Sequence, residues 1–522
     1  MTSSTAVDKK APSLLRSSAV VGVMTMLSRV LGLVRDIVVA NYFGASGTAD
    51  AFFVAFKIPN FLRRLFAEGA FSQAFVPVLT EYKTQRSEKE VQLLVSAVAG
   101  SLGSVLVAIT VLAMIAAPLL AALFAPGFYM AGGEKFDAAV TMLRITFPYL
   151  ALISMTALCG AILNSYGRFA VPAFTPVLLN VSLISCALFL SPQFDPPVLA
   201  LAWGVAMAGV VQFLFQLPFL AQIQMLRAPK LQFSHPGVKR ILALMVPAMF
   251  GVSVTQINLL LDTVLASFLQ TGSVSWLYYS DRLAELPLGV FGIAIATVIL
   301  PSLSRTVAAK SPEEFSKTLD WAVRMVLLIA IPAALALLIL AQPLMVTLFY
   351  YGALTELDVK MASLSLQAYA IGVIAFMLIK VLATGFFSRQ DTKTPVKVGI
   401  QCAVANMVFN LLLIGPLDHV GLALATTLSA FMNAGLLLFG LRKEGVFIWQ
   451  SGWGRMLLRM AVANAALVAV LLFLAPSLQQ WLVWDVWSRI GMMALLVVAG
   501  LAVYGVMLLV MGLRKRHLHP AQ

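Results

Sequence analysis

The sequence predicts an all-α polytopic membrane protein, and three observations carry this prediction. Of its 522 residues, 61% are hydrophobic and only 11% are charged, whereas a soluble domain carries about 25% charged residues. Apolar runs long enough to cross a bilayer recur from about residue 18 to about residue 512. The longest polar segment between them, residues 227–240, has 14 residues and is too short to fold alone. These features exclude a soluble enzyme and a membrane-anchored enzyme with a globular head.

Fourteen transmembrane helices are predicted from apolar runs of about 20 residues, separated by loops with charges, proline and glycine. Residues 326–341 illustrate the pattern, because they are apolar on every face, whereas a spanning β-strand would alternate apolar and polar residues. The predicted spans are 18–43, 50–82, 92–123, 138–164, 172–192, 196–224, 240–269, 273–304, 320–349, 358–388, 394–415, 419–441, 455–475 and 484–512.

Positive charge in the loops predicts the orientation of the chain. The even-numbered loops and both termini hold 23 lysines and arginines, whereas the odd-numbered loops hold Lys135, with Lys360 at a border. Because cytoplasmic loops collect positive residues, a multi-pass protein with both termini in the cytoplasm is expected. The same rule accounts for the net charge of +14, so no nucleic acid is expected as a partner.

The two halves of the chain resemble each other at a spacing of 222 to 229 residues. The segment AFVPVL at 74–79 pairs with VILPSL at 298–303, and GRFAVPAF at 167–174 pairs with RQDTKTPV at 389–396. Spans 1–6 therefore repeat as spans 7–12 in the same direction through the membrane. Transporters with such a parallel repeat bind substrate between the halves near mid-depth. We therefore predict two six-helix lobes around a central cavity, plus two C-terminal helices.

The predicted domain boundaries follow from the repeat and from the charged loops. Spans 13 and 14 lie outside the repeat, so they need a separate role. The predicted parts are a cytoplasmic N-terminal tail (1–17), an N-lobe (18–224), a cytoplasmic linker (225–239), a C-lobe (240–441), the last two spans (442–512) and a cytoplasmic tail (513–522).

Ionisable residues remain inside the predicted spans. A charge that faces lipid at mid-depth costs roughly 2.5–3.5 kcal/mol, so such groups are expected to pair or to face a wet cavity. The surplus is cationic, and guanidinium groups bind phosphate through paired N–H donors, so a phosphate or pyrophosphate ligand is predicted. On charge alone, a carboxylate ligand stays open. The residues are Arg29, Arg35 and Asp36 in span 1, Lys57, Arg63, Arg64 and Glu68 in span 2, and Asp281, Arg282 and Glu285 in span 8.

A second, weaker cluster lies in the C-terminal half. Asp262 in span 7 has no basic neighbour in sequence, Asn406 and Asn410 share a face of span 11, and Thr426 lies early in span 12. A carboxylate with amide and hydroxyl oxygens suits a hard cation such as Na⁺. The alternative is that the amide and hydroxyl groups form interhelical hydrogen bonds.

Motifs for catalysis are missing from the sequence. There is no phosphate-binding Walker A loop, the four histidines form no HExxH motif, and no Ser-His-Asp set is evident. The three cysteines are scattered in apolar runs without metal-binding spacing. We therefore expect a transporter without a cofactor, driven by an ion gradient such as Na⁺ or by the membrane potential, rather than an enzyme.

Four blocks of sequence resemble one known family. They are SRVLGLVRD (28–36), TADAFFVAFKIPNFLRRLFAEGAFSQAFVPVL (48–79), SVSWLYYSDRLAELPLGVFG (273–292) and GFFSRQDTKTPVK (385–397). The chain closely resembles the MurJ (MviN-type) lipid II flippases of the multidrug/oligosaccharidyl-lipid/polysaccharide exporter superfamily. The similarity covers nearly the whole chain and loosens before Ser17 and after about Val446.

The resemblance implies a function. Such a flippase moves lipid II, an undecaprenyl-pyrophosphate-linked disaccharide-pentapeptide, from the inner to the outer leaflet of the bacterial cytoplasmic membrane by alternating access, for peptidoglycan synthesis. The implied partners are lipid II, membrane lipids and other cell-wall synthesis proteins. Spans 13 and 14 would line a groove for the polyprenyl tail.

The resemblance also implies roles for individual residues. Arg29, Arg63 and Arg282 would form a cationic cluster that faces the pyrophosphate, and Glu68 would act as a gate. The charge pattern adds two residues to these roles: Arg64 is predicted to bind substrate, and Asp281 is predicted to form an ion pair near the gate. The family positions matched here are Ser28, Arg29, Arg35, Asp36, Asp50, Asn60, Arg63, Glu68, Ser275, Arg282 and Glu285.

Three alternatives stay open. A flippase for another polyprenyl-linked glycan, of the O-antigen type, would also need basic residues in its cavity. A cation-coupled drug antiporter of the same superfamily would have twelve spans and an acidic cavity. A scaffold for the wall-synthesis complex would need no cavity arginines.

Overall fold

The computed structural model describes residues 14–64, 71–294, 299–308 and 311–514, and every regular element in these ranges is a helix. Nine of the described helices are long and apolar enough to cross a membrane. The all-α prediction is therefore confirmed, whereas the count of fourteen spans and the lobe boundaries stay predictions. Two compact units divide the chain: unit 1 comprises 1–38, 55–120 and 140–252, and unit 2 comprises 39–54, 121–139 and 253–522.

The helices follow the predicted spans along the chain. From the N-terminus they are α1 (Leu14–Phe43), α2 (Gly47–Arg63), α3 (Ser72–Gln85), α4 (Glu88–Ile115), α5 (Ala117–Phe124), α6 (Pro126–Ala131), α7 (Glu134–Thr146), α8 (Pro148–Ser165), α9 (Ala170–Phe189), η2 (Ser191–Gln193), α10 (Leu199–Gln222) and α11 (Pro236–Ala266). The second half holds α12 (Ser273–Ala294), α13 (Leu300–Ala308), α14 (Pro312–Ile339), α15 (Ala341–Phe349), α16 (Glu356–Phe387), α17 (Lys393–Lys443), α18 (Trp453–Leu474), α19 (Leu478–Val483) and α20 (Val486–Val510).

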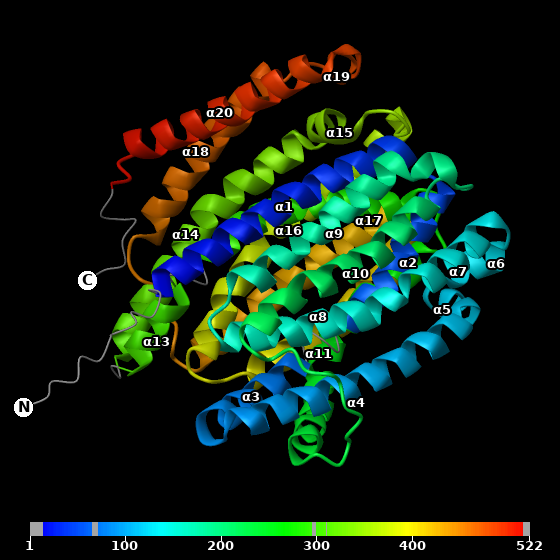
Figure 1. Ribbon diagram of the computed structural model, residues 1–522. Coiled ribbons are helices and arrows are strands. Elements are labelled where there is room, and N and C mark those ends of the chain that lie inside the picture. The colour runs from blue at the N-terminus through cyan, green and yellow to red at the C-terminus, as the bar shows by residue number, and fades with distance from the viewer. Residues whose placement is uncertain (1–13, 65–70, 295–298, 309–310, 515–522) are drawn as a thin grey trace, which may run out of the picture. The chain divides into compact units, whose positions relative to one another are not determined.

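In unit 1, α10 packs against both α8 and α9, and these three helices run side by side in Figure 1. Ser87 and Glu90 form a capping box that begins α4, which satisfies backbone N–H groups at the helix start. The predicted linker 225–239 crosses α4 at close range, because a Cβ on Gly100 would lie 2.2 Å from the Lys230 carbonyl oxygen. Only glycine allows this approach, and the Lys230 N–H donates to the Ser96 carbonyl at 3.0 Å.

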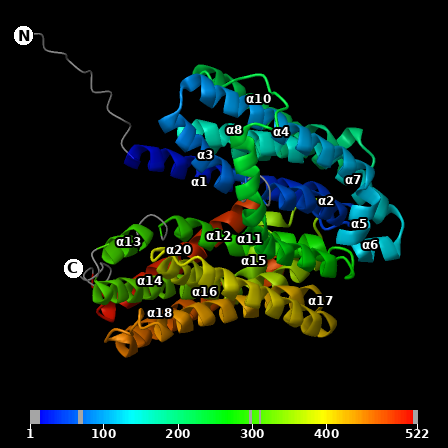
Figure 2. The same ribbon diagram turned by 90° about the horizontal axis from the view of Figure 1, so that it is seen from below.

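In unit 2, α16 packs against α12, α14 and α17, and Figure 2 shows α16 beside α14. The predicted spans 394–415 and 419–441 both lie within α17, which is interrupted where Asp418 has φ 49° and ψ −131°. Pro416 precedes this break, and a Cβ on Gly421 would lie 2.3 Å from the Leu413 carbonyl oxygen. The chain therefore folds back at the predicted boundary, and it needs glycine there.

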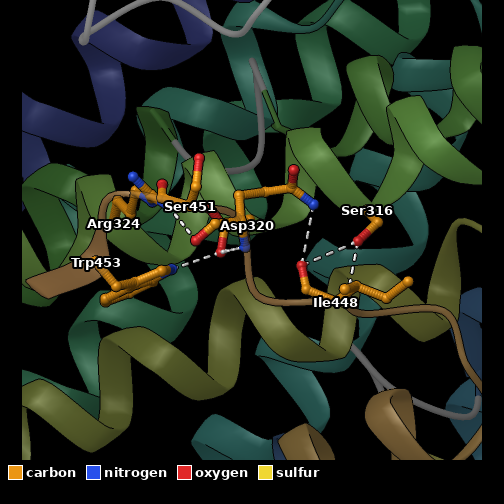
Figure 3. A network of polar contacts seen from close by, with 7 residues as sticks. Ser316, Asp320, Arg324, Ile448, Ser451 and Trp453 are labelled. Carbon is orange, nitrogen blue, oxygen red and sulfur yellow. Dashed lines mark hydrogen bonds and ion pairs between the residues drawn. The ribbon is translucent and has the colours of Figure 1, made fainter.

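A polar network fixes the connection between α17 and α18 to helix α14, as Figure 3 shows. Asp320 on α14 accepts from Arg324 Nε at 2.7 Å and from Trp453 Nε1 at 2.8 Å. Arg324 also donates to the Ser451 carbonyl at 2.9 Å, and the Ile448 N–H donates to Ser316 Oγ at 2.9 Å. Because Trp453 is the first residue of α18, this network determines where the C-terminal helical hairpin begins.

The hairpin of α18 and α20 then packs on α14 through apolar side chains. Leu328 on α14 contacts a cluster that includes Met460 on α18 and Leu508 on α20. The Tyr504 hydroxyl on α20 donates to the Leu328 carbonyl at 2.7 Å. The last two predicted spans are thus attached to unit 2 at both a polar and an apolar site.

Substituting Asp320→Ala is expected to destabilise the protein by roughly 3–5 kcal/mol, because it leaves the largely buried Arg324 charge without its carboxylate. The measurement is thermal unfolding of the purified protein in detergent. Glu313→Ala is the matched control, since Glu313 pairs with Lys317 at 2.6 Å on the same helix but is exposed. That surface pair is expected to contribute at most about 1 kcal/mol. Equal losses in the two variants would contradict the assigned role of Asp320.

Candidate functional site

The predicted substrate-binding segment of α1 is held by a buried ion pair and an asparagine. Arg35 donates to Asp36 Oδ1 through Nε at 2.9 Å and through Nη2 at 2.7 Å, and both residues are buried. Its Nη1 donates to Asn180 Oδ1 on α9 at 3.0 Å. Asn180 Nδ2 in turn donates to the Ser28 carbonyl at 2.9 Å. Both ends of the segment 28–36 are therefore tied to one side chain of α9.

Asn180 is absent from the predicted set of site residues. Its signal in the sequence was an amide inside the apolar span 172–192, which alone does not say which charge it serves. In the same segment, Arg29 has an exposed side chain. The structure therefore separates two arginines that look alike in sequence: Arg35 is buried and engaged within unit 1, whereas Arg29 is exposed.

Helix α2 presents the second group of predicted residues. Arg63 Nε donates to Asn60 Oδ1 at 3.2 Å, which fixes the direction of the guanidinium along the helix. Arg64 is exposed at the end of the described part of this segment. Glu68, the predicted gate, lies outside the described residues.

On α12, Arg282 forms an ion pair with Glu285, with Nη1 3.2 Å from Oε2. The guanidinium also lies over the ring of Tyr278, 5.1 Å from its centroid. The aromatic face and the carboxylate together hold the cation in place. Asp281 is exposed on the same helix. Arg29 and Arg63 belong to unit 1 and Arg282 belongs to unit 2, so the three-arginine cluster stays a prediction.

Asp50 is the most completely enclosed charge of the predicted set, with 0% exposure. One carboxylate oxygen accepts from the Ser275 N–H at 2.9 Å and from its hydroxyl at 2.6 Å. The other accepts from the Gly272 N–H at 2.7 Å and from Lys135 Nζ at 3.0 Å. A carboxylate at a helix N-terminus satisfies its free N–H groups and is favoured by the helix dipole. Asp50 thus caps α12 from a distant part of the chain.

In the sequence, Asp50 and Ser275 stand only as separate positions matched to the family, 225 residues apart. The partner Lys135 was identified only as the one basic residue well inside the odd-numbered loops. Its ammonium also lies 4.1 Å from the centroid of the Phe128 ring. Long-range contacts of this kind leave no periodic signal in the sequence.

Further hydrogen bonds join the same loops of unit 2. The Tyr279 hydroxyl donates to the Gly44 carbonyl at 2.8 Å, and the Ala353 N–H donates to the Asn41 carbonyl at 2.8 Å. The Gly127 N–H donates to Ser267 Oγ at 3.0 Å. Four loops, near residues 41–50, 127–135, 267–276 and 351–358, therefore form one network, which we call the loop lock. All four are odd-numbered loops of the predicted topology.

The predicted cation cluster is partly assembled in unit 2. Asn410 Nδ2 donates to Asp262 Oδ1 at 2.7 Å and to Asn406 Oδ1 at 2.9 Å. The Thr426 hydroxyl donates to the Leu422 carbonyl at 3.1 Å. Only the bond between Asn410 and Asp262 joins two helices, as the alternative interpretation expects, and the other two lie within one helix each. Among the described residues, no three His, Cys, Asp or Glu side chains form a metal-binding group.

Comparison with known proteins identifies a family over most of the chain. The family model described as "Lipid II flippase MurJ" matches residues 39–492. A MurJ protein of Haemophilus influenzae is 50% identical over 507 residues, covering 95% of this chain and 99% of the relative. The Burkholderia cenocepacia protein named "Lipid II flippase MurJ" is 43% identical over 514 residues, covering 96% and 98%. A solved structure titled "Lipid II flippase MurJ, inward closed conformation" has a TM-score of 0.79 at 26% identity, covering 94% of this chain and 98% of that chain.

Substituting Asp50→Ala is expected to open the loop lock, because it leaves Lys135 and the N-terminus of α12 without their carboxylate. Removing one partner of a buried ion pair costs roughly 3–5 kcal/mol. The measurement is maleimide labelling in detergent of a cysteine placed at Ser273, which has 0% exposure. We expect labelling at least tenfold faster in the Asp50→Ala background.

The labelled chain needs its three native cysteines replaced by alanine, and all three are buried. A cysteine at Thr271, which is exposed, serves as the control and should react equally in both backgrounds. An unchanged rate at position 273 would show that Asp50 does not hold the loops together.

Proposed function

This chain belongs to the lipid II flippase MurJ family, and we propose that it moves lipid II from the inner to the outer leaflet of the bacterial cytoplasmic membrane. It is an integral membrane protein with nine described helices of spanning length and hydropathy. The observation that carries the proposal is the match of the family model to residues 39–492. Relatives that are up to 50% identical over nearly the whole chain agree with it. The named activity of those relatives is transport, so we propose a transporter rather than an enzyme.

The cationic residues give the proposal its chemistry. We propose that Arg29, Arg63 and Arg282 face the pyrophosphate and offset its desolvation, with Arg64, Asn60 and Ser28 beside them. Bidentate N–H donors make guanidinium groups well suited to phosphate oxygens. Binding must stay moderate, because a cluster that held the pyrophosphate too tightly would not release it.

Alternating access is the proposed mechanism. In the predicted topology, the odd-numbered loops lie on the side opposite the cytoplasm. We therefore propose that the loop lock of Asp50 closes the transporter on that side. In this proposal the lock holds while the head group enters from the inside, and its opening releases the head group outside. Glu68, Asp281 and Glu285 would position the arginines or compete with the substrate for them. The membrane potential is worth about 2.3 kcal/mol per unit charge per 100 mV and could reset the carrier.

We propose that the hairpin of α18 and α20 contacts the polyprenyl tail, as its position outside the repeat suggests. Support comes from the exposed side chains of this hairpin, which are apolar, as contact with a hydrocarbon chain inside the bilayer requires. Examples are Leu472 and Phe473 on α18 and Leu501 and Val510 on α20. Both termini are proposed to lie in the cytoplasm, and the partners are lipid II, membrane lipids and other cell-wall synthesis proteins.

The alternatives differ in charge and in substrate. A cation-coupled drug antiporter is disfavoured by the cationic surplus in spans 1 and 2, where Arg29, Arg35, Lys57, Arg63 and Arg64 outnumber Asp36, Asp50, Glu68 and Glu81. A flippase for another polyprenyl-linked glycan would use the same basic residues, so only the substrate distinguishes it. A scaffold would not require exposed arginines on apolar helices.

Depletion in the native cell tests the function, with wild type or variants supplied in trans. The measurement is the amount of lipid II in each leaflet. Depletion should raise lipid II inside and remove it outside, and wild type should restore the outer pool. Arg29→Ala, Arg63→Ala and Arg282→Ala should each lower the outer pool more than tenfold at normal membrane levels.

The control is Arg442→Ala, because Arg442 is exposed at the end of α17 and outside the proposed cavity. Full activity in all three cavity variants would remove the argument for an anionic substrate. Normal lipid II exposure after depletion, with loss of another surface glycan, would transfer the proposal to that glycan.

Sodium coupling is a separate proposal, with Asp262, Asn406, Asn410 and Thr426 as ligands. If Na⁺ binds there, the melting temperature of wild type should rise in NaCl relative to KCl at equal ionic strength, because a ligand stabilises the state that it binds. Asp262→Ala should abolish this difference. Asp485→Ala, an exposed carboxylate that caps α20, should keep it. Equal melting temperatures of wild type in both salts would contradict sodium binding, and these residues would then serve only as hydrogen-bond partners.

A further inference from the structure

Unit 1 contains a cavity of about 500 Å³ among α2, α3, α8, α9 and α10, lined by both apolar and polar residues. This volume lies in the range of ligand pockets, roughly 300–1,000 Å³. Among the described residues, the polar groups that line it are uncharged except for one cation and include no carboxylate. They include Arg63, Thr156, Asn164, Thr175, Gln212 and Gln216.

Thr175 determines which way the two glutamine amides point. Gln212 Nε2 donates to the Thr175 carbonyl at 3.0 Å, and a carbonyl can only accept. The Thr175 hydroxyl donates its proton to the Val171 carbonyl at 2.9 Å, so its oxygen is left to accept from Gln216 Nε2 at 2.9 Å. Both amide nitrogens are therefore committed to Thr175, and neither amide can turn over without losing a bond.

The two amide oxygens are left as acceptors. Gln212 is 2% exposed and Gln216 is 1% exposed, and neither Oε1 atom has a hydrogen-bond donor among the described residues. A buried polar atom without a partner costs free energy, so native structures rarely contain one without a reason. Here two such atoms occur on residues that line one cavity. The groups that satisfy them must carry O–H or N–H donors.

We propose that this cavity binds the hydroxyl- and amide-bearing sugar part of the lipid-linked substrate, while Arg63 at the same cavity faces the pyrophosphate. Sugar hydroxyls and N-acetyl N–H groups supply the donors that the two glutamine oxygens lack. The inference rests on the proposed function and names the part of the substrate that unit 1 recognises. It also assigns specificity to residues that carry no charge.

The opposing view is that Gln212 and Gln216 only brace α10 against α9. A brace would affect stability and every ligand alike, whereas a sugar site would affect only ligands that carry sugar. Two probes separate these views: lipid II, and undecaprenyl pyrophosphate, which has the same tail and pyrophosphate but neither sugar nor peptide. Lipid II without its pentapeptide should behave as lipid II does, which would show that the sugar and not the peptide is recognised. Binding of each probe to the purified full chain is measured by native mass spectrometry.

The double variant Gln212→Met, Gln216→Met removes both acceptors at similar side-chain volume. We expect lipid II to bind about tenfold more weakly or worse, as the loss of one to two hydrogen bonds implies, with undecaprenyl pyrophosphate unchanged. Because this variant also breaks the bonds to Thr175, a second variant leaves the amides in place. Ala157→Leu fills the cavity from α8 and should give the same selective loss.

Thr110→Val is the matched control, since the Thr110 hydroxyl on α4 is also buried without a partner among the described residues but does not line this cavity. It should leave both probes bound as in wild type. Equal weakening of both probes in Ala157→Leu, or no weakening of lipid II, would overturn the sugar site. Failure of wild type to bind either probe would instead count against the proposed function itself.

Discussion

The loop lock depends on one buried charge, the carboxylate of Asp50. It accepts four hydrogen bonds, two of them from the N-terminus of α12 and one from the ammonium of Lys135. A buried carboxylate is tolerated only when its lone pairs are satisfied and its charge is balanced. The three loops that carry Asp50 and its partners must therefore stay together while Asp50 stays buried, and the loop near 351–358 joins them through the bond from the Ala353 N–H to the Asn41 carbonyl. An ionic contact of this kind can be replaced by water, which suits a closure that has to open.

Buried arginines, like the buried carboxylate, need partners that satisfy their hydrogen bonds and balance their charge. The arginines of the chain therefore fall into two kinds, those with such partners and those that are exposed. Arg35 and Arg324 each use a neighbouring acid together with an amide or backbone carbonyls. Arg489 on α20 is 5% exposed and donates to the carbonyls of Trp481, Tyr350 and Leu482. Such residues hold helices in position. Arg29, with its exposed side chain, is of the other kind, and it is one of the arginines proposed to face the pyrophosphate.

Three of the parts of lipid II, namely its pyrophosphate, its sugar and its polyprenyl tail, are each proposed to contact a different part of the chain. The pyrophosphate is assigned to guanidinium groups, the sugar to the amide-lined cavity of unit 1, and the polyprenyl tail to the apolar hairpin of α18 and α20. Charge gives strength of binding but little discrimination among polyprenyl-linked substrates. Directed hydrogen bonds from fixed amides discriminate better, because a ligand without the right donors leaves buried acceptors unpaired.

The sequence alone determined the helical class, the break near Asp418 and the charged residues inside apolar runs, because hydropathy and charge are local properties. Only the tertiary structure decided that Asp50 caps α12 beside Lys135, that Asn180 holds Arg35, and that Gln212 and Gln216 line a cavity with amide oxygens that lack a partner among the described residues. Hydrogen bonds between residues more than a hundred positions apart depend on how helices pack, and no period or motif in a single sequence records that packing.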